Sequence, residues 1–249
     1  MQNYKMVIAY DGRRYKGFRK TRSDAEKSIQ GKLESILEKL YETEIEVISA
    51  ISTNAGVHAQ QLVINFNAPN ESISDQGIFD YFETYLPDDI VTFSVEKADA
   101  RFHSRYGVKT ITYEYRLWKS DAPHRPIFDR QYVNVMKAPL RVNGMQKAAG
   151  LLEGEHDFAA YATKSKANSS VKTLTEITIE ETEYEIIITM KADGFLLNME
   201  RFIVGTLIQV GLGERSADTV VKGFKTQDSH DVGHKAMAHA LCLKEVTYE

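Results

Sequence analysis

The chain has 249 residues, of which 43% are hydrophobic and 27% are charged, and its formal net charge is −4 at pH 7. This composition is typical of a globular protein that buries a core in one or two domains, and it excludes a collagen-like or largely disordered chain. The sequence contains no run of eighteen apolar residues and no apolar leader after Met1, and its single Cys242 cannot form an internal disulfide. We therefore expect a cytoplasmic protein that does not enter a membrane.

Hydrophobic periodicity predicts the elements of the first half of the chain. Ser23 and Glu26 have the spacing of a capping box ahead of the first helical pattern. The predicted order is a strand at 5–10, a helix at 29–40, strands at 44–50 and 61–66, a helix at 78–85 and a strand at 91–96.

The second half repeats this alternation. We predict strands at 109–117, 174–180, 184–191 and 238–247, and helices at 142–152 and 196–210. The fold class is therefore α+β, with two α+β halves at 1–107 and 108–249 whose sheets join edge to edge and leave a cleft between them.

A basic segment at residues 13–22 follows the first predicted strand. It carries six cations and no acidic residue, which leaves −10 for the rest of the chain. A local positive patch on an acidic protein indicates binding to nucleic-acid phosphates, although a solvated surface loop is the alternative. Tyr15 and Phe18 could stack on bases or anchor the loop to the core. The predicted RNA contacts are Arg13, Arg14, Lys16, Arg19, Lys20 and Arg22, with a weaker second group at Lys164, Lys166 and Lys172.

Patterns for metals and nucleotide cofactors are incomplete. His230, His234 and His239 have ligand-like spacing, but no Cys or carboxylate pattern completes a zinc site. Because no Walker or dinucleotide glycine motif is present either, we expect no metal and no small-molecule cofactor.

Residues 50–59 read A-I-S-T-N-A-G-V-H-A and resemble the A-G-R-T-D-A-G-V-H-A loop of the TruA-type tRNA pseudouridine synthases. Further segments resemble the same family in the same order along the chain. These are Y-D-G-R-R-Y-K-G-F at 10–18, L-P-D-D-I at 86–90, F-H-S-R-Y at 102–106, Y-E-Y at 113–115, G-E-H-D-F at 154–158, F-L-L-N-M-E-R at 195–201 and G-T-L at 205–207.

The resemblance implies a pseudouridine synthase fold of two ferredoxin-like, RNA-recognition-motif-like halves, with the active site in the cleft. It also implies a homodimer that binds tRNA around the anticodon stem-loop. It assigns Tyr113 to the tyrosine that packs on the flipped base, Arg201 to the arginine that pairs with the catalytic carboxylate, and His58, His103 and Arg105 to RNA contacts.

The resemblance fails at the catalytic position. Asn54 stands where the family has its Asp, and Ser52 stands where the family has an Arg. An amide neither attacks as a nucleophile nor accepts a proton at neutral pH, so Arg201 would face an amide. We expect a tRNA-binding protein with lost or strongly impaired catalysis.

Two alternatives remain open. An active synthase could use another carboxylate, such as Glu200, which replaces a family Val; a charge facing solvent is the other interpretation of that residue. A structural or regulatory interaction protein without RNA is the second alternative.

Overall fold

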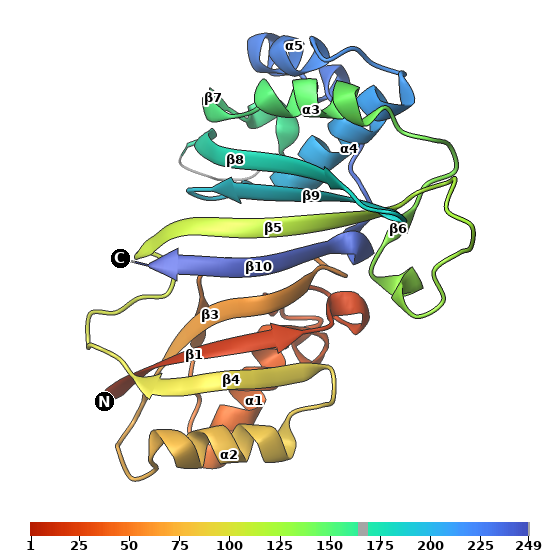
Figure 1. The fold of residues 1–249 in the computed structure, drawn as a ribbon. Helices are drawn as coiled ribbons and strands as arrows, with labels where there is room; N and C mark the ends of the chain where they lie inside the picture. Colours follow the sequence, from red (N-terminus) through yellow and green to blue (C-terminus); the bar gives the residue numbers. More distant parts are fainter. Residues whose placement is uncertain (164–168, 249) are drawn as a thin grey trace. The chain divides into compact units, whose positions relative to one another are not determined.

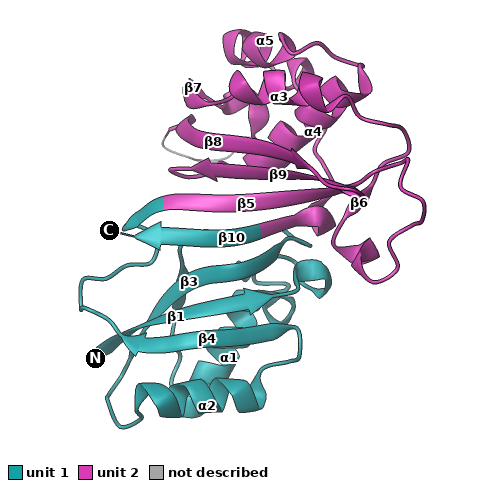
Figure 2. Ribbon diagram, in the orientation of Figure 1, with its two compact units in different colours: residues 1–109, 243–249 teal, residues 110–242 magenta. Residues whose placement is uncertain are grey.

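The computed structural model describes residues 1–163 and 169–248. It divides into two compact units, residues 1–109 with 243–249 as unit 1 and residues 110–242 as unit 2 (Figure 2). Lys164 and Lys166, from the weaker predicted RNA contact, lie outside the described residues.

Unit 1 is built on antiparallel pairing of β1 with β3 on one side and β4 on the other, and its strand order is β4-β1-β3-β10 (Figure 1). Alternate residues of β1 are buried, and Tyr4, Met6 and Ile8 are each 0% exposed. The short β2 pairs with β3 from Val47 opposite Phe66 to Ser49 opposite Ile64. The elements are β1 (Gln2–Tyr10), α1 (Ile29–Tyr41), β2 (Val47–Ser49), β3 (His58–Ala68), α2 (Asp75–Tyr85), β4 (Ile90–Lys97) and most of β10 (Leu241–Tyr248).

The N-cap of the first helix lies five residues after the predicted capping residue Ser23. Ser28 is the N-cap of α1, and its hydroxyl accepts a hydrogen bond from the Gly31 amide at 3.0 Å. Ser23 instead precedes a 3-10 turn at Ala25–Lys27, so the predicted capping box at Ser23 and Glu26 is wrong.

Unit 2 has the strand order β5-β9-β8-β7 with antiparallel pairs, and β6 pairs in parallel with β5. Helices α3 and α4 pack on each other, and α3 contacts β8. The elements are most of β5 (Val108–Trp118), β6 (Asn134–Val135), α3 (Val142–Gly150), β7 (Gly154–Asp157), β8 (Val171–Glu181), β9 (Glu185–Ala192), α4 (Met199–Leu212) and α5 (Thr219–Thr226).

The α+β class predicted from the periodicity is confirmed, with differences in detail. Residues 238–240 form a 3-10 turn ahead of β10, and the structure groups residues 243–249 with unit 1, whereas the sequence analysis assigned them to the second half. The edge-to-edge joining of the sheets stays a prediction. The remaining 3-10 helices are Gly12–Arg14, Ala25–Lys27, Asp129–Gln131, Ala159–Tyr161 and Ser229–Asp231.

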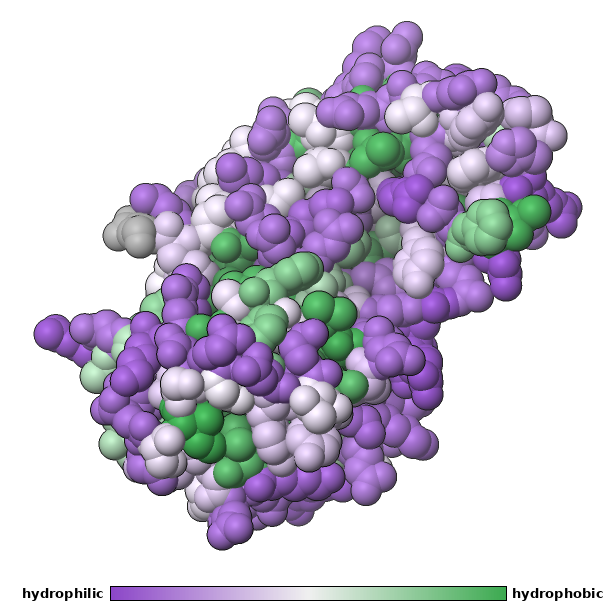
Figure 3. Space-filling model, turned by 60° about the horizontal axis from the view of Figure 1, so that its bottom comes forward, coloured by the Kyte–Doolittle hydropathy of each residue, from purple (hydrophilic) through white to green (hydrophobic). Residues whose placement is uncertain are grey.

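The visible surface is mostly hydrophilic, with separate small apolar patches (Figure 3). Among the helices of the described residues, we find none with the length and apolar character needed to span a bilayer.

Candidate active site

The loop that carries Asn54 is fixed by the basic segment of unit 1. Gly17 and Asn54 form an isolated antiparallel bridge, the Phe18 amide donates to the Thr53 carbonyl at 3.0 Å, and the Val57 amide donates to the Asn54 carbonyl at 3.1 Å. Gly17 has φ +107°, and a Cβ there would lie 2.8 Å from the Thr53 carbonyl oxygen. Only glycine fits this approach, because it has no side chain and adopts positive φ readily.

Buried hydrogen bonds between polar groups also hold the same loop in place. The hydroxyls of Tyr10 and Thr53 are hydrogen-bonded at 2.7 Å. His58 is 6% exposed, and its Nδ1 accepts the Gly12 amide at 3.1 Å and lies 3.2 Å from an Asp11 carboxylate oxygen. The predicted RNA-contact residue His58 is therefore placed inside the unit, where it supports the loop.

Asn54 and Ser52 are both half-buried within this supported loop. The amide of Asn54 can donate and accept hydrogen bonds, and the hydroxyl of Ser52 can do the same, but neither carries charge. The described loop thus holds no ionised group at the two positions where the resemblance places a carboxylate and a guanidinium.

In unit 2, Tyr113 lies on β5 and is 1% exposed. Its ring packs edge-to-face against Phe195, with centroids 5.1 Å apart and an interplanar angle of 89°. This is a favourable aromatic geometry, which fixes the ring direction.

Arg201 lies in the first turn of α4 and is held by hydrogen bonds within unit 2. Its Nε donates to the Ala236 carbonyl at 2.7 Å, and its Nη1 donates to Asn198 Oδ1 at 3.3 Å. Asn198 has φ +65° and donates from Nδ2 to the Thr163 hydroxyl at 3.0 Å. Burial lowers the pKa of Arg201, and the neighbouring Glu200 carboxylate opposes that shift.

Glu200 is 3% exposed, so the interpretation of this residue as a charge facing solvent is wrong. The first turn of α4 is packed closely enough to enclose it, since Met199 beside it is 0% exposed. A carboxylate near a helix N-terminus is favoured by the helix dipole.

The cations of the basic segment differ in their ion pairing. Asp11 binds Arg13 through both carboxylate oxygens, Asp89 lies 3.4 Å from Arg14, and Glu34 binds Lys20. The other three have no hydrogen-bonding or ionic side-chain partner among the described residues. These unpaired cations are Lys16, Arg19 and Arg22.

The two aromatic residues of the segment are anchors. Tyr15 is 7% exposed and Phe18 is 1% exposed, which leaves neither ring free to stack on a base. Burial raises the pKa of Tyr15, and its hydrogen bond to the Asp89 carboxylate at 2.5 Å raises that pKa further.

His103 and Arg105 lie in unit 1 between β4 and β5 and line one pocket of about 300 Å³ together with Arg19 and Ser52. Lys172, on β8, is half-buried in unit 2.

Two of the three ligand-like histidines have separate partners, and His234 is exposed. His230 Nδ1 lies 2.8 Å from an Asp228 carboxylate oxygen, and His239 Nε2 lies 3.1 Å from the Val133 carbonyl. Within residues 1–163 and 169–248, no three His, Cys, Asp or Glu side chains gather as a metal site would require.

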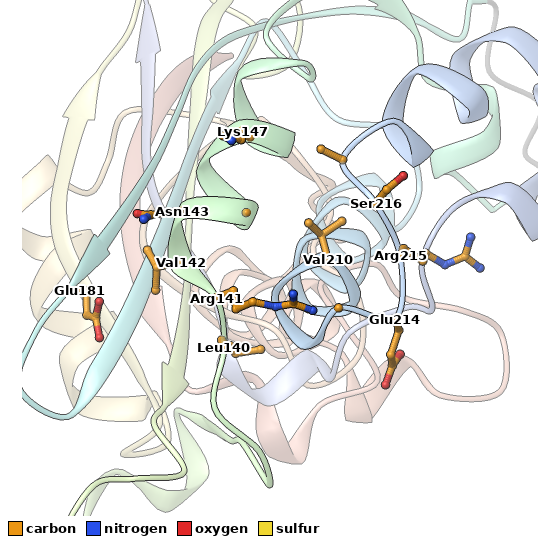
Figure 4. A pocket seen from close by; sticks show the side chains of 13 residues that line it. Leu140, Arg141, Val142, Asn143, Lys147, Glu181, Val210, Glu214, Arg215 and Ser216 are labelled. Carbon is orange, nitrogen blue, oxygen red and sulfur yellow. The ribbon is translucent and has the colours of Figure 1, made fainter.

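A separate hollow of about 770 Å³ in unit 2 lies between the start of α3 and the end of α4 (Figure 4). None of the candidate catalytic residues lines it. The Arg141 side chain extends below Val210, and its Nη2 lies 1.3 Å from where a Cβ of Gly213 would be, so Gly213 makes room for it.

Tyr10, Thr53 and Asn198 support the site although their sequence motifs gave them no role. Asn198 had a usable signal, because Asn tolerates the left-handed backbone conformation better than most residues. The Tyr10 to Thr53 contact joins residues 43 apart and has no local sequence signal.

Comparison with known proteins places these features in a family. A sequence model described as "tRNA pseudouridine synthase" matches residues 148–249. The chain is 39% identical to "tRNA pseudouridine synthase A" of Bacillus sp. (strain KSM-64), 37% identical to "tRNA pseudouridine synthase A 2" of Bacillus cereus and 36% identical to "tRNA pseudouridine synthase A 1" of Clostridium tetani. Each of these alignments covers 100% of both chains.

A solved structure titled "Structure of H/ACA RNP bound to a substrate RNA containing 2'-deoxyuridine" is 10% identical, with a TM-score of 0.36 over 83% of this chain and 44% of that chain. That likeness is too distant to carry an argument. The full-length relatives are decisive, and the chain belongs to the tRNA pseudouridine synthase A family.

Proposed function

We propose that this protein binds tRNA in the region of the anticodon stem-loop and isomerises uridine weakly or not at all. The relatives are named for tRNA pseudouridine synthesis, which supports tRNA as the RNA that this protein binds. The observation that carries the proposal is the neutral side chain of Asn54 on a loop that is otherwise built as a rigid support.

The reaction of the family requires an ionised oxygen. Isomerisation detaches a flipped uracil from its ribose and rejoins it through carbon, and both a nucleophilic and a proton-abstracting route need a carboxylate. Asn54 supplies an amide, and each tenfold loss of rate corresponds to about 1.4 kcal/mol of barrier. Ser52 also lacks the guanidinium that the resemblance places at its position, so a second charged group is missing from the same loop.

Affinity for tRNA is expected to come from the unpaired cations of the basic segment. Counterion release gives a slope of log affinity against log salt of about −0.9 per phosphate contact. Three contacts from Lys16, Arg19 and Arg22 predict a slope of about −2.7, so raising salt from about 50 to 200 mM should weaken binding about fortyfold. Engagement of all six cations would give a slope of about −5 and a loss near a thousandfold.

The test is tRNA binding measured against salt for two charge-neutralised variants. Replacing Lys16, Arg19 and Arg22 with Gln should remove most of the salt dependence. The matched control replaces Arg13, Arg14 and Lys20 with Gln and should remove much less, because carboxylates already neutralise those cations. If wild-type protein shows no salt-dependent tRNA affinity, the RNA assignment fails and an interaction protein without RNA takes its place.

The alternative of an active synthase that uses Glu200 is tested by the Glu200→Gln variant. The side chain is 3% exposed, which speaks against its meeting a substrate sugar. Pseudouridine formation that is present in wild-type protein and abolished in Glu200→Gln would support the alternative.

A further inference from the structure

A pocket of about 300 Å³ in unit 1 brings together two motifs that lie far apart in the sequence. Arg19 enters from the basic segment, and His103, Arg105 and Tyr106 enter from the loop between β4 and β5. The volume is at the small end of the range for small-molecule sites, which is about 300–1,000 Å³.

Two guanidiniums in this pocket form no ion pair with the described residues. Arg19 and Arg105 are exposed, and neither side chain has a hydrogen-bonding or ionic partner among the described residues. One carboxylate, that of Glu46, also lines the pocket. The charge balance therefore remains positive, and planar guanidiniums are suited to holding a phosphate.

The pocket also contains a buried polar group without a partner. Ser49 lines it and is 1% exposed, and its hydroxyl makes no hydrogen bond. Such groups are rare in folded proteins because desolvation without a hydrogen bond costs free energy. The hydroxyl oxygen is itself buried, so it lies beneath the wall of the pocket and out of reach of a ligand.

An exposed aromatic side chain stands at the edge of the pocket. Tyr106 is 82% exposed, and its ring packs against His103 with centroids 4.1 Å apart. The Arg105 amide donates to His103 Nδ1 at 3.2 Å, which holds the imidazole beneath the tyrosine. An exposed, supported ring is a platform on which an unpaired base can stack.

We propose that this pocket binds one unpaired nucleotide of an RNA, with its phosphate between Arg19 and Arg105 and its base on Tyr106. The inference rests on the proposed tRNA binding and adds a defined nucleotide site within unit 1.

The affinity for a short oligouridylate is measured by fluorescence anisotropy at several salt concentrations. Its salt dependence tests whether the two arginines share one phosphate. Arg19→Gln and Arg105→Gln should each weaken binding about five- to tenfold but change the salt slope little, because the remaining guanidinium still neutralises the shared phosphate. The double variant should reduce the slope by about 0.7, the value for one single-strand phosphate contact. Slopes that fall additively would show independent surface charges and overturn the proposal. Arg101→Gln is the matched control, since Arg101 is exposed in the same loop but does not line the pocket, and it should change affinity less than twofold.

The base position is tested with an oligouridylate that carries photoreactive 5-bromouridine. The crosslink should map to Tyr106. Tyr106→Ala should abolish the crosslink and weaken oligouridylate binding about tenfold. Tyr106→Phe should retain the affinity because the aromatic ring remains. A crosslink elsewhere, or equal affinity of Tyr106→Ala and wild type, would contradict the site.

The outcomes separate the two proposals. If the wild-type protein and the pocket variants bind tRNA equally well, the proposed nucleotide site is contradicted and the tRNA proposal stands. If the pocket binds oligouridylate but the protein does not bind tRNA, the tRNA proposal alone is contradicted. If the protein binds neither RNA, both proposals are contradicted.

Discussion

At the scale of single residues, the position of Asn54 is determined by glycines in a neighbouring segment. A Cβ at Gly12 would lie 1.9 Å from the Val57 carbonyl oxygen, and Gly17 adopts φ +107° beside Thr53. The Y-D-G and Y-K-G pattern is thus needed for the close approach of two backbones. The glycines position the loop whether or not its tip is catalytic.

We predict that Gly17→Ala lowers the free energy of unfolding by about 1–3 kcal/mol, because alanine at positive φ is strained and its Cβ meets the Thr53 carbonyl. Chemical denaturation measures this change. Gly150→Ala is the control: Gly150 ends α3 and a Cβ there meets nothing within 4 Å, so stability should stay constant or rise by about 0.5 kcal/mol. Equal effects of the two substitutions would show that the close approach at Gly17 contributes no stability.

The candidate residues could be chosen from the sequence, but their surroundings could not. Motif positions identified Asn54, Arg201 and Tyr113 directly. The burial of Glu200 and the pairing of Arg14 with Asp89 depend on contacts between distant segments, and hydrophobic periodicity does not predict such contacts.

At the scale of elements, the start of α1 shows why a capping pattern is ambiguous. Ser23 and Glu26 fit a capping box, but the helix starts where Ser28 can accept from Gly31 while its hydroxyl donates to the Ala25 carbonyl at 2.7 Å. Ser28 is 0% exposed, so its hydroxyl has no water to replace these partners.

The Ser28→Ala variant should lower the free energy of unfolding by about 1–2 kcal/mol through loss of the cap. Ser23→Ala should leave it unchanged within about 0.5 kcal/mol, because Ser23 is exposed and caps no helix. Thermal or urea unfolding of both variants makes the comparison. A larger loss of unfolding free energy for Ser23→Ala than for Ser28→Ala would show that Ser23 caps the helix, as the sequence pattern predicts.

Long periodic elements were predictable, and short ones were not. The main strands and α1 to α4 carry a clear period of two or 3.6 residues. In contrast, β6 has two residues, β7 has four and α5 has eight. Such segments are too short for a period to stand out, and tertiary packing determines their conformation.

At the scale of the whole molecule, the family assignment predicts assembly. We propose that the protein forms a homodimer, as the resemblance implies, so that both subunits contact one tRNA. Light scattering at micromolar concentration should give twice the mass of the 28.2 kDa chain. A monomeric mass in the presence and absence of tRNA would contradict this assembly.

We predict that the intact protein binds tRNA without converting its uridines to pseudouridine. Asn54→Asp alone should restore little activity, because Ser52 still lacks the guanidinium that the resemblance places beside the carboxylate. Adding Ser52→Arg to Asn54→Asp should restore more than either substitution alone.

The most direct test is to incubate excess wild-type protein with unmodified tRNA and to map pseudouridine at every uridine, with tRNA binding confirmed in the same sample. We predict a bound complex and no pseudouridine above the level without protein. Robust pseudouridine formation by the wild-type protein would contradict the central claim and would show that Asn54 does not abolish the reaction.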